Sequence, residues 1–125
     1  MAEQRQAVGR RGEEAAVRFL HEQGYRVVER NYRCRFGEID LIARDGETLA
    51  FIEVKTRRSQ AFGPPALAVT IEKQRHLVKA SQVYLAQRGK AHELCRFDVV
   101  TIEMQADTLR IEIIKNAFQP RSEGG

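Results

Sequence analysis

The sequence lacks the features that mark proteins with a structural zinc site, exported proteins and membrane-spanning proteins. Its two cysteines, Cys34 and Cys95, are far apart and have no CxxC or Cys/His partner pattern, so no zinc site is visible. The three histidines are scattered without ligand spacing. No apolar run approaches the ~18 residues that span a membrane, and the first residues, MAEQRQAVGRR, contain no apolar signal core. We therefore expect a cytoplasmic protein with no membrane partner.

The chain also lacks a strong excess of either charge. Lys and Arg number 21 and Asp and Glu number 17, which gives a net charge of +4. This balance permits nucleic-acid binding without requiring it. Arginine makes up 16 of the 21 cations, and its planar fork grips phosphate at two points, although a GC-rich genome would also enrich Arg. Composition leaves both explanations open.

No internal repeat divides the chain, and 125 residues suit one domain. We expect this domain to span residues 1–118, with residues 119–125 as a flexible C-terminal tail. Apolar side chains recur at helical spacing over residues 7–23 and 70–88, and a glycine follows each segment. Strand patterns occupy residues 25–33, 38–44, 48–56, 94–102 and 109–114. The order α-β-β-β-α-β-β predicts an α/β fold, a mixed central β-sheet flanked by helices.

The chemistry-bearing residues lie in a predicted hairpin, GEIDLIA (residues 37–43) followed by FIEVK (residues 51–55). If Asp45 and Gly46 form a two-residue turn, Arg44 faces Glu47, and Asp40 faces Phe51 further along. Alternation then places one polar set on one face, namely Glu38, Asp40, Glu53 and Lys55. The apolar set on the other face is Ile39, Leu41, Ile52 and Val54. Three carboxylates and an ammonium are thus expected to converge.

Asp40 and Glu53 would then be diagonal neighbours, ~7–8 Å apart at Cα, a gap that one hard cation can bridge. A divalent metal held there can polarise a phosphodiester and deprotonate an attacking water. The ammonium of Lys55 would orient that water or neutralise charge that develops on the phosphate. The alternative is a plain surface ion pair between Glu53 and Lys55, since an acid-x-Lys triplet is common by chance. The position of this triplet at the end of an apolar strand, after an acid-rich strand, favours a site.

The pattern G-E-I-D, a hairpin, then F-I-E-V-K-T-R resembles the PD-(D/E)XK, or restriction-endonuclease-like, nuclease superfamily. Over roughly residues 9–103 the chain is similar to the uncharacterised bacterial YraN-like family, which is related to archaeal-type Holliday junction resolvases. The resemblance implies a Mg²⁺- or Mn²⁺-dependent endonuclease acting on DNA, with branched or junction DNA among its substrates. It implies Asp40 and Glu53 as metal ligands, Lys55 as the catalytic lysine, and a homodimer. Ile39 stands where the superfamily has proline, a position that varies.

Resolvase-like members add a glutamate from the first helix, and the chain offers Glu13 and Glu14. At ~100° per residue, Glu13 lies at the flank of the apolar stripe and Glu14 points almost opposite to it. The resemblance also aligns Gly12-Glu13 with the family pattern, so Glu13 is the candidate third ligand. A plain preference of Glu13 for the positive end of the helix is the structural alternative.

Four further polar residues call for an interpretation. Gln74 stands within the apolar stripe of the second helix, where it would support the carboxylates, contact a phosphate or make a structural hydrogen bond. Arg57 and Arg58 are candidate phosphate contacts, with a solvated charge pair as the alternative. Asp98, between two apolar strand residues, is expected to be structural. A non-catalytic nucleic-acid-binding module of the same fold, and an interaction protein without nucleic acid, remain alternative functions.

Overall fold

The computed structural model describes residues 2–57, 69–89 and 93–120, and the side chains among them except those of residues 2–10 and Gln105. Its elements are α1 (Ala2–Glu22), β1 (Arg26–Cys34), β2 (Gly37–Asp45), β3 (Thr48–Arg57), α2 (Ile71–Gln87), β4 (Cys95–Gln105) and β5 (Thr108–Phe118). The expected element order is confirmed. The outer elements are longer than expected, since α1 begins at Ala2 and β5 continues to Phe118.

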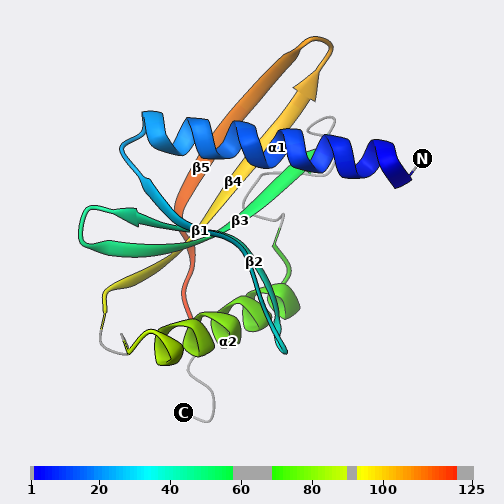
Figure 1. The fold of residues 1–125 in the computed structure, drawn as a ribbon. Coiled ribbons are helices and arrows are strands. Elements are labelled where there is room, and N and C mark those ends of the chain that lie inside the picture. The colour runs from blue at the N-terminus through cyan, green and yellow to red at the C-terminus, as the bar shows by residue number, and fades with distance from the viewer. Residues whose placement is uncertain (1, 58–68, 90–92, 121–125) are drawn as a thin grey trace.

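The strands form one mixed sheet in the order β1-β2-β3-β4-β5. β3 and β4 are parallel, and the other neighbouring pairs are antiparallel. A parallel pair needs a long crossover connection, and α2 lies within the one between β3 and β4. Figure 1 shows the sheet between the two helices, with α1 across one face and α2 against the other.

Each face of the sheet has its own apolar core. The core on the α1 side includes Ala16, Leu20, Leu41, Ile52, Val100 and Ile102. The core on the α2 side includes Ile42, Phe51, Leu77, Ala80, Tyr84 and Val99. Successive strand residues point to opposite faces, and β3 accordingly sends Phe51 toward α2 and Ile52 toward α1. By the same alternation Glu53 and Lys55 project on the α2 side.

Close packing at Gly12 fixes α1 against the end of β3. A Cβ atom at Gly12 would lie 2.7 Å from Thr56 Oγ1 and 3.5 Å from Ile102 Cδ1. The first of these separations is too short for atoms packed as in a protein interior. The absence of a side chain at Gly12 therefore lets the helix rest on the strand segment that carries Glu53 and Lys55.

Asp98 is structural, as expected, and stabilises an irregularity between β4 and β5. The register of these strands shifts between Phe97 and Val99. The Asp98 carboxylate, on a residue only 1% exposed, accepts hydrogen bonds from Asn116 N at 2.8 Å, Arg96 Nε at 2.8 Å and Tyr25 Oη at 3.0 Å. A buried charge with this many donors is fully accommodated.

Candidate functional site

The hairpin that carries the candidate residues forms with a register different from the expected one. Asp45 pairs with Thr48 and Arg44 with Leu49, so the turn is Gly46-Glu47 and the expected pairing of Arg44 with Glu47 is wrong. Gly46 has a φ of +62°, which suits a tight hairpin turn. The shift is by two residues, so the paired side chains of Leu41–Asp45 and Thr48–Ile52 keep their expected faces. The pairing ends at Leu41–Ile52, and Asp40 and Glu53 lie one residue beyond that pair, where their side chains interact.

The alternation along β2 is interrupted at Asp40. Leu41 belongs to the core on the α1 side, yet Ile39 and Ile42 both belong to the core on the α2 side. The expectation that Ile39 packs on the same face as Leu41 is therefore wrong. β1 has an irregularity at the same level, because Asn31 has a φ of +53° and lies between the pairs Arg30–Leu41 and Tyr32–Ile39. The backbone bend leaves the Asp40 side chain beside β3.

Asp40, which is half-buried, and Glu53, which is buried, form a pair of acids. The backbone N–H of Val54 donates to Asp40 Oδ2 at 2.8 Å, and this bond holds the carboxyl group against β3. The pKa of Asp40 is raised to about 8, chiefly by burial and then by the hydrogen bond and charge of Glu53, whereas the Val54 bond and Lys73 oppose the shift. Burial and the second acid therefore oppose ionisation of Asp40, and a nearby cation would relieve that opposition.

Glu53 is incompletely satisfied. The residue is only 4% exposed, and among the described residues its Oε2 atom has no hydrogen-bond partner. Lys73 Nζ lies 3.5 Å from that oxygen, within ion-pair distance but without a hydrogen bond. A buried carboxylate oxygen left in this state is costly, and a cation bound at the pair would remove the cost.

The other two predicted carboxylates lie elsewhere. Glu38 forms an ion pair with Arg33 at 3.5 Å. In the amide orientation that satisfies Asn31, its nitrogen lies 2.8 Å from Glu38 Oε1 and 3.2 Å from Glu13 Oε1. Glu13 and Glu38 thus share Asn31 and are not joined to Asp40 and Glu53. Across the described residues, no three acidic, His or Cys side chains are grouped to hold a metal ion, so the expected convergence of three carboxylates is not found.

Comparison with known proteins places the chain in a family. The profile of the uncharacterised protein family UPF0102 matches residues 12–102. A UPF0102 protein of Symbiobacterium thermophilum is 53% identical over 112 residues, which cover 89% of this chain and 95% of the relative. One of Syntrophus aciditrophicus is 50% identical over 111 residues, covering 89% and 87%. The chain belongs to the UPF0102 family. This confirms the membership in the YraN-like family that was expected from the sequence. The matched segment contains Glu13, Asp40, Glu53, Lys55 and Lys73.

The remaining predicted site residues of this UPF0102 chain differ in burial and in the contacts that they make. Lys55 is half-buried and shares the face of Glu53. Gln74 Nε2 donates to Val69 O at 3.1 Å, which is the structural hydrogen bond named as one alternative. Arg57 Nη2 lies 3.4 Å from Glu103 Oε1, and its side chain is 13% exposed, so its charge is engaged within the fold and not solvated. Arg58 lies outside the described residues.

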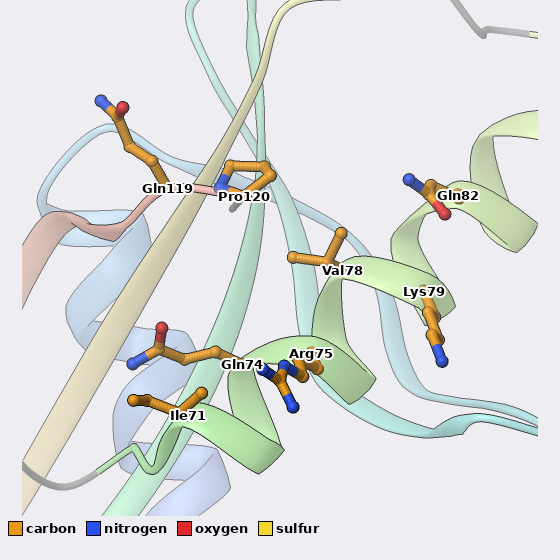
Figure 2. Close-up of a pocket in the computed structure, with 8 residues that line it drawn as sticks. All are labelled: Ile71, Gln74, Arg75, Val78, Lys79, Gln82, Gln119 and Pro120. Carbon is orange, nitrogen blue, oxygen red and sulfur yellow. The ribbon is translucent and has the colours of Figure 1, made fainter. Parts of the chain in front are cut away.

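The UPF0102 chain has a pocket on α2 that does not include the acid pair. It has a volume of about 260 Å³, and Figure 2 shows six lining residues from α2 and two, Gln119 and Pro120, from the segment after β5. The α2 residues are Ile71, Gln74, Arg75, Val78, Lys79 and Gln82.

Among the described residues, no helix is long and apolar enough to cross a membrane.

Sequence reasoning missed Lys73. The residue belongs to the first turn of α2, where Thr70 Oγ1 accepts a hydrogen bond from Lys73 N at 3.1 Å and caps the helix. With Thr70 as N-cap, the third helical residue is the position where a capping box places Glu or Gln. A lysine there is a departure that the sequence displays, although its partner is visible only in the fold.

Proposed function

We propose that this UPF0102 chain is a metal-dependent phosphodiester hydrolase that acts on nucleic acid, DNA in the first place, with Asp40 and Glu53 as the metal-binding pair. The restriction-endonuclease-like fold of the PD-(D/E)XK superfamily belongs to the same proposal. The observation that carries it is the buried Oε2 atom of Glu53, which has no hydrogen-bond partner among the described residues, on a side chain that interacts with a second carboxyl group. Such a pair is unfavourable without a bound cation.

The donor set fits Mg²⁺ or Mn²⁺. Both are hard cations that prefer oxygen ligands, and Mg²⁺ commonly uses one or two carboxylates together with water and substrate phosphate. Two carboxylates therefore suffice, and Glu13 and Glu38 are not needed as direct ligands. A bound divalent metal would supply Lewis-acid polarisation of the phosphodiester and a nucleophile at neutral pH.

The chain itself provides orientation and charge. Val54 N–H fixes one oxygen of Asp40 at 2.8 Å and leaves the other for a ligand. Lys55 follows Glu53 by two residues on the same strand and face, so its ammonium projects beside the pair. There it would hold the attacking water or neutralise negative charge that grows on the phosphate in the transition state.

A cleavage screen tests the proposal. Purified protein is incubated with Mg²⁺ or Mn²⁺ and with labelled single-stranded, duplex, flapped and four-way DNA, and Glu53→Gln is purified in parallel as a control for contaminating nucleases. We expect metal-dependent cleavage of at least one substrate by the native chain and none by Glu53→Gln. If the native chain cleaves no substrate but binds DNA in a salt-dependent manner, the non-catalytic binding module replaces the hydrolase.

A further inference from the structure

The first turn of α2 presents a cation to the acid pair. Lys73 Nζ lies 3.5 Å from Glu53 Oε2, and the two side chains are 37% and 5% exposed. The partly exposed ammonium of Lys73 thus approaches a buried carboxylate oxygen of Glu53.

Helix energetics do not explain a lysine at this position. The first turn of a helix carries partial positive charge, so a cation there is disfavoured and an anion favoured by about 0.3–1 kcal/mol. Lys73 occupies the third helical residue after the cap Thr70, where a glutamate would complete a capping box. The local preference is therefore opposed by the residue present, and its partner is the acid pair across the gap between α2 and β3.

The contact is also loose. Lys73 is within ion-pair range of Glu53 Oε2, yet that oxygen keeps no hydrogen bond among the described residues. A lysine ammonium sits on a flexible four-carbon stem and is strongly hydrated. Its partly exposed side chain can move into solvent without disturbing the backbone of α2, which Thr70 caps independently.

We propose that Lys73 is a built-in counterion that neutralises the Asp40–Glu53 pair in the metal-free protein and is displaced when a divalent metal binds. This inference rests on the proposed function, since it assigns a regulator of metal affinity to the same site. The ammonium and the metal compete for the same carboxylate oxygens. Lys73 therefore lowers metal affinity while it preserves the fold of the unloaded protein.

The test is a Mn²⁺ titration by calorimetry on the native chain, Lys73→Met and Lys73→Arg. We expect Lys73→Met to bind Mn²⁺ at least about tenfold more tightly, because the competing charge is gone. Lys73→Arg should bind more weakly than the native chain, because a guanidinium can grip Glu53 at two points. Lys79→Met is the matched control, since it removes the same charge from the exposed face of the same helix, and its affinity should equal that of the native chain.

Stability provides a second readout. Without metal, Lys73→Met should unfold at a lower temperature than Lys79→Met, because it leaves the acid pair without a cation, and Mn²⁺ should restore the difference. If Lys73→Met fails to fold, the Lys73→Arg titration decides alone. Native-like affinity in both Lys73 variants contradicts the counterion role and leaves the metal site standing. Absence of Mn²⁺ binding in the native chain and in all variants instead removes the proposed metal site itself.

Discussion

Asp40 and Asp98 belong to the same sheet but have opposite electrostatic surroundings. Asp98 accepts hydrogen bonds from a guanidinium, a phenol and a backbone amide. Asp40 accepts one backbone hydrogen bond and otherwise meets another acid. Donors therefore surround the Asp98 carboxylate, whereas burial and a second acid oppose ionisation of Asp40. The two aspartates should therefore respond to substitution with opposite signs.

Asp40→Asn should stabilise the metal-free protein. The raised pKa of about 8 lies above the ordinary value of 3.8, so the folded state holds a proton that the unfolded state releases between about pH 4 and pH 8. Native stability therefore falls as pH rises through that window. Asparagine keeps the acceptor for Val54 N–H and removes the titration. Urea unfolding in chelator should show a gain of about 1–3 kcal/mol at pH 9 that shrinks toward pH 4; a loss at pH 9 would contradict the account.

Asp98→Ala should destabilise the fold by about 3–5 kcal/mol, because it leaves the partly buried charge of Arg96 with fewer partners and frees the β4–β5 irregularity. Urea unfolding at pH 7 measures the loss, and Asp98→Asn should fall between alanine and the native residue. A cost below about 1 kcal/mol would show that the hydrogen bonds of Asp98 are replaced by water.

At the contact of α1 with β3, a substitution at Gly12 has two opposing effects on stability. Gly12→Ala gains about 1 kcal/mol of helix propensity, yet its Cβ would lie 2.7 Å from Thr56 Oγ1, and overpacking of this kind costs about 1–3 kcal/mol. We expect a net loss of stability in urea unfolding. In a Thr56→Ala background the same substitution should become stabilising, and a loss of equal size in both backgrounds would exclude the contact as its cause.

The elements were predictable from the sequence because each depends on local patterns. Apolar periodicity and the glycines after both helices located α1 and α2, and the alternation of β3 placed Glu53 and Lys55 on one face. The hairpin register was not predictable from Asp45-Gly46, since Gly46 can occupy either position of a two-residue turn. Because the register was wrong by two residues, Asp40 and Glu53 still lie on the same face of the sheet, as expected.

The irregularity at Asp40 and the role of Lys73 depend on contacts between elements. Ile39 changes face because β1 bends at Asn31 and β2 follows it in the pairing, and no period within β2 reports this. The same bend separates Glu38 from the pair. Lys73 meets Glu53 because α2 crosses from β3 to β4 over that face, a tertiary placement that helical spacing alone does not specify.

Residues from several helices and strands of the domain meet at or near the acid pair. Glu53 lies in β3, Asp40 in β2 and Lys73 in α2. Helix α1 packs against Thr56, which lies further along β3. A ligand bound there contacts groups that come together only in the folded state, so it should stabilise the native chain by mass action.

Mn²⁺ should therefore raise the free energy of unfolding of the native chain by ~2.7 kcal/mol at one hundred times its dissociation constant. Glu53→Ala should show no such increase, because a ligand is missing. Urea titrations with and without Mn²⁺ provide the measurement, and NaCl at equal ionic strength controls for general salt effects. An equal increase in Glu53→Ala would place the bound metal elsewhere on the protein.

Cleavage by site variants separates the functions of the three central residues. Asp40→Ala and Glu53→Ala should each abolish metal-dependent cleavage while fold and nucleic-acid binding persist, because both remove ligands. Lys55→Ala should keep the metal but lose turnover by about 10²–10³-fold, because its charge acts in the transition state. Glu47→Ala, an exposed acid in the turn of the same hairpin, is the matched control and should cleave at the native rate. Single-turnover assays at saturating Mn²⁺, paired with calorimetry, measure both properties. Weakened Mn²⁺ binding by Lys55→Ala, or undiminished cleavage by Glu53→Ala, would refute these assignments.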